Sequence, residues 1–302
     1  MISLAHQAAL RSIARVVEET VEPTDPSEAL ARIADQLRAG RVLVITGAGV
    51  STDSGIPDYR GPNGSLTRHR PMTYQEFKYD PDALQRYWAR SFVGWRHMDE
   101  ARPNRTHFAL AELEQSGFIS GVITQNVDGL HSAAGSRRVL ALHGSLAKVV
   151  CLNCGFLEDR RALDARFAAA NPSFSPSYDQ DQVNPDGDVA LSPADVACFR
   201  LVGCLSCGSE LLKPDVVYFG EPVPPARKAQ AQTMLAEASS VLAVGTSLAV
   251  MSGFRLILDA RKQGKPVRVI NGGPGRADDR ADVVWRTGVG PAFDALLDEL
   301  GV

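Results

Sequence analysis

The segment RVLVITGAGVSTDSGIPDYRG, residues 41–61, decides the fold. Its first half is a continuous apolar run, typical of a strand that is buried on both faces of a parallel sheet. The run ends at Gly47, Ala48 and Gly49, whose small side chains let a backbone approach a pyrophosphate, and helix N–H groups beyond them are natural anion donors. We therefore predict that a nucleotide binds where this strand ends.

The same segment is an imperfect dinucleotide fingerprint. Thr52 stands where the third glycine of G-x-G-x-x-G belongs, and residues 65–70, SLTRHR, lack the acid that a dehydrogenase offers to the ribose. Asp58, Tyr59 and Arg60 follow a proline, which predicts a rigid loop that carries polar groups back across the site. The missing acid argues against an NAD-dependent dehydrogenase, for which a lasting change in nicotinamide absorbance would be the sign.

Three further apolar runs, at residues 117–126, 241–248 and 265–272, alternate with stretches of helical periodicity. This alternation predicts an α/β fold with a Rossmann-like doubly wound parallel sheet that helices cover on both faces. Ligands of such sheets bind beyond the carboxyl ends of the strands, so we expect the polar strand ends to share one crevice. Those ends are Gln125-Asn126, Gly245-Thr246-Ser247 and Asn271-Gly272-Gly273.

Four of the five cysteines form two C-x-x-C pairs, CLNC at 151–154 and CLSC at 204–207. Four thiolates close a tetrahedral zinc site and leave no position for water, so we expect one structural Zn²⁺. Its ligands would be Cys151, Cys154, Cys204 and Cys207. The odd fifth cysteine and the lack of a secretory signal pattern argue against a disulfide framework.

The domain organisation follows from where the strand and helix alternation breaks. It breaks between the cysteine pairs, in a region rich in proline, aspartate and serine, and over residues 80–98, where Trp88, Phe92 and Trp95 are spaced to pack on one face. The predicted parts are a helical N-terminal extension (1–29), the Rossmann-like domain (30–75, 118–148 and 211–302), a helical insertion (76–117), and a smaller zinc-binding domain (149–210) with a long loop (171–193).

Charge and hydropathy exclude several classes of partner. The formal net charge is −3, so no basic field favours nucleic acid or an anionic membrane. No apolar run approaches the roughly 20 residues that a membrane-spanning helix needs. We expect a cytoplasmic monomer without nucleic-acid or membrane partners, and a mitochondrial location stays open.

Two polar stretches stand out within the apolar pattern. TQNVDGLH at 124–131 places Gln125, Asn126 and Asp128 where side chains could hold a ribose hydroxyl pair and a carboxamide, or could form an Asx turn that caps the next helix. LALHGSL at 140–146 interrupts an apolar run with His143, and a lone histidine there is by itself more often a core residue than a catalyst. Neither stretch decides the function alone.

Taken together, the order of the motifs resembles the sirtuin family from about residue 30 onward. The matching stretches are GAGVSTDSGIPDYR, TQNVDGLH, LHGSL, the two cysteine pairs, KPDVVYFGE, GTSL and VING, and the details GIPDYR, RYWARSFVGW and PDGDVALS are most similar to the class II branch. The resemblance implies an NAD-dependent protein-lysine deacylase. Such an enzyme consumes NAD and produces nicotinamide, free lysine and O-acyl-ADP-ribose from acyl-lysine proteins or peptides.

The resemblance also implies roles for individual residues. His143 would be the general base, Asn126 would hold the nicotinamide ribose, and Tyr59 takes the place of a phenylalanine that shields the reactive sugar carbon. The implied NAD contacts are Gly47, Ala48, Gly49, Ser51, Asp58, Tyr59, Arg60, Gln125, Asn126, Val127, Asp128, Gly245, Thr246, Ser247, Asn271, Gly272, Gly273 and Val289. The implied substrate contacts are Val217, Phe219, Gly220 and Glu221, which would pair with the peptide as an added strand.

Tyr87 and Arg90 carry one further hypothesis. They lie three residues apart and are therefore neighbours on a helix, where a guanidinium can pair with an acyl carboxylate, as in the sirtuin branch that removes succinyl groups. The alternative is a solvated arginine on an amphipathic helix. At residues 251–255, MSGFR departs from the Tyr-Pro-Ala run that is common in the family, so the peptide preference is open.

Two other functions compete with the deacylase. A protein mono-ADP-ribosyltransferase would use the same NAD site, and labelled ADP-ribose on an acceptor protein would identify it. A zinc-ribbon module for nucleic acid or protein is disfavoured because the cysteine pairs lie too far apart in the sequence and no basic patch accompanies them.

Overall fold

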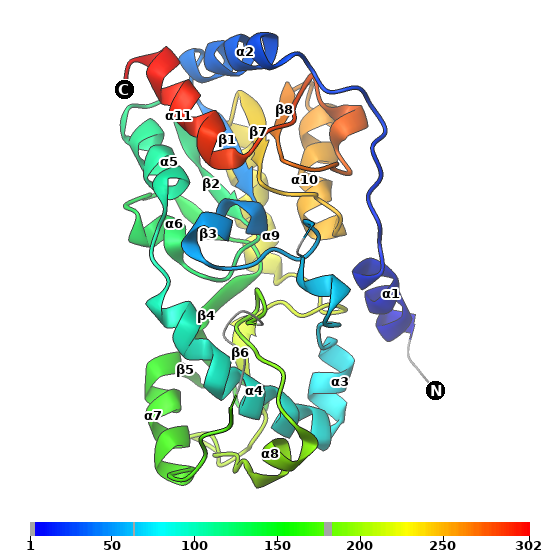
Figure 1. The fold of residues 1–302 in the computed structure, drawn as a ribbon, viewed down its shortest axis with the longest axis vertical. Helices are drawn as coiled ribbons and strands as arrows, with labels where there is room; N and C mark the ends of the chain where they lie inside the picture. The colour runs from blue at the N-terminus through cyan, green and yellow to red at the C-terminus, as the bar shows by residue number, and fades with distance from the viewer. Residues whose placement is uncertain (1–3, 63, 178–182) are drawn as a thin grey trace.

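The computed structural model describes residues 4–62, 64–177 and 183–302. Residues 1–3 of the predicted extension and 178–182 of the predicted loop lie outside the described residues. Figure 1 shows a larger layered part, which holds both the sheet and the C-terminus, above a smaller part that contains β5, α7 and α8.

The larger part is built on a parallel sheet. Within the described residues this sheet has six strands in the order β3-β2-β1-β7-β8-β9. They are β1 (Val42–Thr46), β2 (Ile119–Thr124), β3 (Val139–Ala141), β7 (Ser240–Val244), β8 (Val267–Ile270) and β9 (Val283–Trp285). The order reverses between β1 and β7, which confirms the predicted doubly wound architecture and places the ligand crevice at this point.

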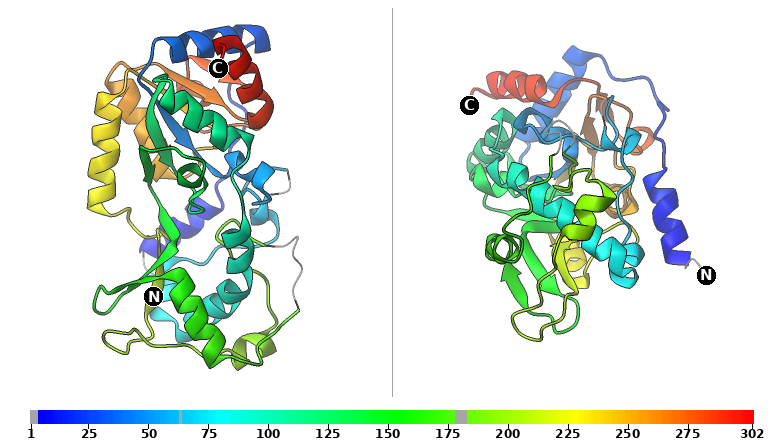
Figure 2. Two further views of the ribbon diagram at one scale, coloured as in Figure 1. Left: turned by 90° about the vertical axis from the view of Figure 1, so that its left-hand side faces the viewer. Right: turned by 60° about the horizontal axis from the view of Figure 1, so that its bottom comes forward.

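The sheet is buried on both faces because successive side chains of a strand point to opposite sides. On β1, Val42 and Val44 enter one apolar core, and Leu43 and Ile45 enter the other. The left view of Figure 2 shows helices on both sides of the sheet. The first core is covered by α2 (Pro26–Arg38), α5 (Arg105–Gln115) and α11 (Val289–Leu300), and the second by α9 (Pro225–Glu237) and α10 (Met251–Lys262).

The smaller part contains an antiparallel sheet of three strands in the order β5-β4-β6, as described. Its elements are β4 (Gly144–Cys151), β5 (Leu157–Asp159), β6 (Leu212–Val216), α7 (Arg160–Ala170) and α8 (Pro193–Cys198). This sheet begins five residues earlier than the predicted domain boundary at 149, because β4 starts at Gly144, directly after His143. His143 therefore lies in the turn that joins the two sheets.

The helical insertion packs against the smaller part. Its helices are α3 (Tyr74–Tyr79) and α4 (Pro81–Glu100), and Trp88, Phe92 and Trp95 of α4 are all buried. Trp88 and Phe92 join the apolar core that also contains Phe167 of α7. The remaining elements are α1 (Leu4–Ile13), α6 (Leu130–Ala133) and the 3-10 turns η1 (Ala48–Val50), η2 (Thr52–Ser54), η3 (Ser65–Thr67) and η5 (Asp278–Arg280).

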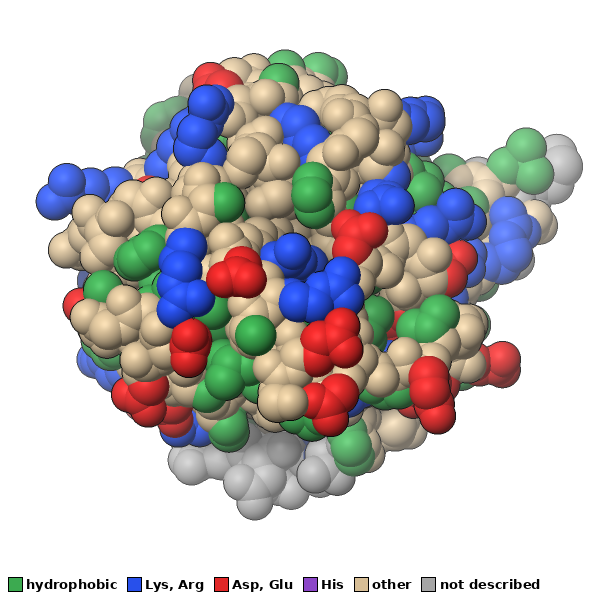
Figure 3. Space-filling view, turned by 90° about the horizontal axis from the view of Figure 1, so that it is seen from above, with side chains coloured by type: hydrophobic (Ala, Val, Ile, Leu, Met, Phe, Trp, Pro, Cys, Tyr) green, Lys and Arg blue, Asp and Glu red, His purple; other side chains and the backbone are tan. Residues whose placement is uncertain are grey.

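The surface carries charges of both signs. On the face drawn in Figure 3, basic and acidic side chains are interspersed. At the same end of the molecule, Arg38 pairs with Asp35 at 3.2 Å and with Glu299 at 2.8 Å. Among the helices described here, none is long and apolar enough to cross a membrane.

Candidate active site

A cavity of about 1680 Å³ lies at the carboxyl ends of the parallel strands. Every residue that we predicted to contact the nucleotide or the substrate lines this cavity, apart from Arg90. His143 lines it as well. Segments that are far apart in the sequence, among them the ends of β1, β2, β7 and β8, thus contribute to one site, as the polar strand ends predicted.

The glycines after β1 allow two strand ends to touch. A Cβ atom on Gly49 would lie 2.8 Å from the carbonyl oxygen of Gly245, and one on Gly47 would lie 2.6 Å from Cβ of Thr246. The Gly49 N–H donates to the Gly245 carbonyl at 2.9 Å. The glycines are therefore required by the close approach of the segments that follow β1 and β7, and both glycines line the cavity.

Asn126, Ser51 and Asp128 form a hydrogen-bonded chain on the cavity wall. Asn126 Nδ2 donates to Ser51 Oγ at 3.0 Å, and Ser51 Oγ donates to Asp128 Oδ2 at 2.8 Å. Asp128 Oδ1 also accepts the Leu130 N–H at 2.9 Å, at the start of α6. The Asx-turn alternative for this stretch is therefore observed, and because Asp128 also lines the cavity, its role in binding a nucleotide stays a prediction.

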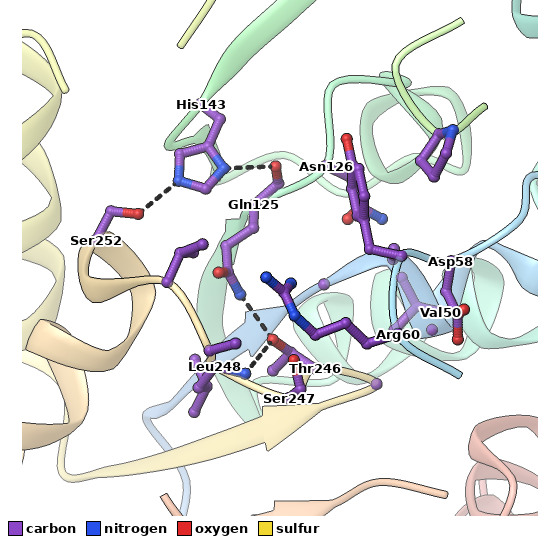
Figure 4. Close-up of a pocket in the computed structure, with 18 of the residues that line it drawn as sticks. Val50, Asp58, Arg60, Gln125, Asn126, His143, Thr246, Ser247, Leu248 and Ser252 are labelled. Carbon is purple, nitrogen blue, oxygen red and sulfur yellow. Dashed lines mark hydrogen bonds between the residues drawn. The ribbon is translucent and has the colours of Figure 1, made fainter. Parts of the chain in front are cut away.

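His143 is held in a defined tautomer (Figure 4). Its Nδ1 lies 3.0 Å from the carbonyl oxygen of Gln125, which can only accept, so Nδ1 carries the proton. Its Nε2 lies 2.7 Å from Ser252 Oγ and is therefore an acceptor. Burial lowers the pKa of His143 to about 4, so the ring is neutral at physiological pH. A neutral imidazole with an acceptor nitrogen toward the cavity can take a proton from a bound hydroxyl group.

Close packing of β4 on β6 requires a glycine directly after His143, at position 144. Its φ is +88°, and a Cβ atom there would lie 1.9 Å from the carbonyl oxygen of Asp215. Only glycine allows β4 to come this close to β6. The carbonyl oxygen of His143 accepts the Val217 N–H at 2.8 Å, so the same approach fixes the histidine against the predicted substrate segment.

Arg60 reveals a contact that the sequence did not indicate. Its guanidinium donates to the carbonyl oxygens of Ser12 at 3.2 Å and Arg15 at 3.4 Å. Residues 12–17 also line the cavity, so the N-terminal extension forms part of the wall. In Figure 4 the Arg60 side chain extends toward the middle of the cavity. No motif marks residues 12–17, and only the tertiary structure brings them to the site.

The predicted substrate segment is held by its own turn. Glu221 Oε2 accepts the Tyr218 N–H at 3.0 Å and pairs with Lys213 Nζ at 3.1 Å. Phe219 accepts the Tyr74 N–H at 2.9 Å, and its ring meets that of Tyr59 edge-to-face at 6.4 Å. Glu221 therefore holds the turn of the segment, and Val217 and Phe219 line the cavity.

Tyr87 and Arg90 lie on α4, but only Tyr87 reaches the cavity. The Tyr87 ring is buried against Phe77 and Tyr218, at 5.2 and 5.7 Å between centroids. The Arg90 guanidinium pairs with Asp188 at 3.2 Å and donates to the Val189 carbonyl. The hypothesis that Arg90 binds an acyl carboxylate stays a prediction, and in this structure the guanidinium already has an acidic partner.

The four paired cysteines fit a structural zinc ion. Their sulfur atoms all lie within 4.8 Å of one another, with Cys151 to Cys207 and Cys154 to Cys204 both at 3.7 Å. Zn–S bonds of about 2.3 Å in a tetrahedron require sulfurs about 3.8 Å apart. A hydrogen bond from Asn153, above other contacts, lowers the pKa of Cys207 to about 6, whereas burial raises the pKa of Cys151 to about 11. A bound metal ion would hold both groups as thiolates.

Comparison with known proteins identifies the family. The model of the Sir2 family matches residues 47–252, which is most of the chain. The chain belongs to the Sir2 family. This confirms the resemblance to sirtuins drawn from the motifs.

Relatives of this Sir2 protein span nearly its whole length. It is 61% identical over 274 residues to "NAD-dependent protein deacetylase 1" of Corynebacterium efficiens, an alignment that covers 90% of this chain and 98% of the relative. It is 45% identical over 244 residues to the human "NAD-dependent protein lipoamidase sirtuin-4, mitochondrial", covering 80% and 77%. A solved structure described as "Sir2-p53 peptide-NAD+" superposes with a TM-score of 0.70 at 29% identity, covering 90% of this chain and 98% of that one.

Proposed function

We propose that this protein is an NAD-dependent protein-lysine deacylase that releases nicotinamide, free lysine and O-acyl-ADP-ribose. The observation that carries the proposal is the neutral His143 ring, whose acceptor nitrogen lies on a cavity that also collects the predicted NAD contacts. The relatives named NAD-dependent protein deacetylases support the same activity.

We propose that three residues, His143, Ser252 and Asn126, act at the nicotinamide ribose of NAD. Once the acyl oxygen has displaced nicotinamide, His143 Nε2 accepts a proton from a ribose hydroxyl group, which then attacks the bound acyl carbon. Ser252 holds Nε2 in the resting protein and must give up its hydrogen bond to the sugar. Asn126, positioned by Ser51, holds the nicotinamide ribose.

The acyl-lysine would enter from the side of the substrate segment. We propose that the peptide pairs with the main chain near Val217 and Phe219 as an added strand. Tyr59, packed edge-to-face on Phe219, then shields the reactive sugar carbon from water. Its hydroxyl group is the one chemical difference from the phenylalanine that is usual at this position.

We also propose the setting in which the enzyme acts. On the face drawn in Figure 3 basic and acidic side chains are interspersed, and the formal net charge is −3, which supports a protein without a nucleic-acid partner. We propose that it works as a cytoplasmic monomer whose single zinc ion stabilises the smaller part without touching the substrate.

The test is an acyl-lysine panel. Purified protein is incubated with NAD and acetyl-, succinyl-, glutaryl-, lipoyl- and long-chain acyl-lysine peptides, and nicotinamide release and acyl-ADP-ribose are measured. His143→Ala should retain the fold and lose at least ~100-fold in kcat, the contribution expected of a general base. Transfer of labelled ADP-ribose to protein, without acyl-ADP-ribose, would replace this proposal with the transferase.

A further inference from the structure

The first turn of α10 packs directly against the residue that holds His143. A Cβ atom on Gly253 would lie 2.5 Å from Gln125 Oε1, so a glycine at this position lets the turn pack on Gln125. Gln125 is fixed in turn, since its Nε2 donates to Thr246 Oγ1 at 2.9 Å. The carbonyl oxygen of Gln125 is also the acceptor for His143 Nδ1. The start of the helix and the imidazole therefore share one support.

An unusual backbone conformation directs α10 toward this support. Leu248, three residues before the helix, has a φ of +49°, in the left-handed region that a bulky side chain rarely adopts. Its N–H donates to Thr246 Oγ1 at 3.1 Å, and its side chain is buried in the same apolar core as Phe254 and Ile257 of α10. Tertiary contacts thus hold a costly turn, and with it the first turn of α10, beside His143.

The hydroxyl group of Ser252 contacts the histidine directly. Ser252 is the second residue of α10, is half-buried, and lines the cavity together with His143. In Figure 4 its side chain extends from the start of the helix toward the imidazole ring. The distance from Oγ to His143 Nε2 is 2.7 Å, and among the described residues this is the one hydrogen bond that Oγ makes. The hydroxyl group does not cap α10, whose N-cap residue is Val250, so capping does not explain the serine.

The imidazole has one nitrogen that can exchange a proton with a ligand. Nδ1–H of His143 donates to the Gln125 carbonyl, so Nε2 is the single acceptor of the neutral ring. In the resting protein the Ser252 hydroxyl donates to Nε2 and competes there with a ribose hydroxyl group. Once Nε2 has taken the ribose proton, the ring is a cation within the protein, and its Nε2–H requires an acceptor. A serine hydroxyl can donate in the first state and accept in the second.

We propose that Ser252 is a positioning residue for His143, which donates a hydrogen bond to the neutral imidazole before the reaction and accepts one from the imidazolium after proton transfer. The proposal rests on the proposed deacylase function. In the transfer step the ribose O–H bond breaks, the proton goes to Nε2, and the electron pair of the oxygen forms the bond to the acyl carbon. Ser252 Oγ then accepts the new Nε2–H, because the ribose oxygen is now bonded to carbon.

Ser252→Ala should have opposite effects on binding and on turnover. Without the resting competitor, ADP-ribose should bind about threefold to tenfold more tightly, which titration calorimetry measures in the absence of any reaction. Without the acceptor, formation of acyl-ADP-ribose in a single turnover should slow about 10-fold to 100-fold, the effect of one hydrogen bond to a charged group. A serine that only fills space would not combine tighter binding with slower turnover.

The displacement of nicotinamide provides an internal reference. It precedes the step that uses His143, so incorporation of labelled nicotinamide into NAD in the presence of an acyl-lysine peptide reports a step without the imidazolium. In Ser252→Ala the ratio of this exchange to acyl-ADP-ribose formation should rise about tenfold or more. Ser252→Thr and Ser252→Val have the same shape and differ in the hydroxyl group, so the ratio should rise in Ser252→Val alone.

Ser132→Ala is the matched control. Ser132 is an exposed serine on α6 that does not line the cavity, so its replacement removes a hydroxyl group from a helix without touching His143. We expect no change in ADP-ribose affinity, in the single-turnover rate or in the exchange ratio of this variant.

Three results would overturn the assignment: ADP-ribose that binds Ser252→Ala no more tightly than the wild type, a single-turnover rate that Ser252→Ala leaves unchanged, or equal exchange ratios in Ser252→Thr and Ser252→Val. If the wild-type protein turns over an acyl-lysine peptide in these experiments, the deacylase function stands and only the role of Ser252 fails. If it turns over none, the proposed function itself fails, and the affinity for ADP-ribose still tests the competition at His143.

Discussion

Gly144→Ala tests whether the approach of β4 to β6 positions His143, the proposed general base. The new Cβ would lie 1.9 Å from the Asp215 carbonyl oxygen, so the two strands must separate by about 1.5 Å to restore ordinary contact. The positive φ costs about 1–2 kcal/mol for alanine. Relieving the overlap adds about 1–3 kcal/mol, the usual cost of overpacking.

Gly264→Ala provides the matched control. Its φ is +68°, and nothing lies within 4 Å of the position that a Cβ would take, so alanine there meets only the backbone cost. We expect Gly144→Ala to lower the melting temperature by more than Gly264→Ala, by about 2–4 °C for each additional kcal/mol. Thermal unfolding followed by circular dichroism measures both variants.

Turnover should separate the two variants further. The His143 carbonyl and the Val217 N–H are joined at 2.8 Å, so a strand shift of about 1 Å moves the base relative to the substrate. A displacement of that size can cost about 100-fold in rate, and we expect this loss in Gly144→Ala and none in Gly264→Ala. Equal stability and equal turnover of the two variants would refute the reasoning.

Three other predictions follow from the site. Cys151→Ser should lose the bound zinc and lower the melting temperature, and metal analysis of the purified variant that still finds one zinc per chain would contradict the assignment. Because the pKa of His143 is lowered to about 4 from 6.5, the unfolded chain binds more protons between these values, so stability should rise with pH over that window and the kcat profile should show no ionisation near 6.5. Arg90→Met should reduce acetyl-lysine and succinyl-lysine turnover alike, because the buried Asp188 loses its guanidinium partner; a loss confined to succinyl-lysine would instead support acyl-carboxylate binding by Arg90.

The central strands could be predicted from the sequence because each is an apolar run long enough to be recognised. β1, β2, β7 and β8 have four to six residues that are almost entirely buried. The edge strands β3 and β9 have only three residues each, too few for a periodicity to appear. Their place in the sheet comes from pairing with β2 and β8.

The site was predictable where its residues follow strands directly, and less so where it depends on tertiary contacts. Asn126 and Asp128 follow β2, and the structure brings them to the cavity as expected. Ser252, the hydrogen-bond partner of His143, lies 109 residues away at the start of α10. No sequence motif there indicates a contact with His143. Helical spacing predicts that Arg90 lies beside Tyr87. It cannot predict the ion pair of Arg90 with Asp188, because Asp188 lies in the loop between α7 and α8.

The most direct test of the account is a crystal structure of the protein with NAD and an acetyl-lysine peptide. We predict that the nicotinamide ribose lies between Asn126 and His143, with His143 Nε2 hydrogen-bonded to a ribose hydroxyl group in place of Ser252. A nucleotide bound elsewhere, or an imidazole that still holds Ser252 and contacts no sugar, would contradict the proposed mechanism.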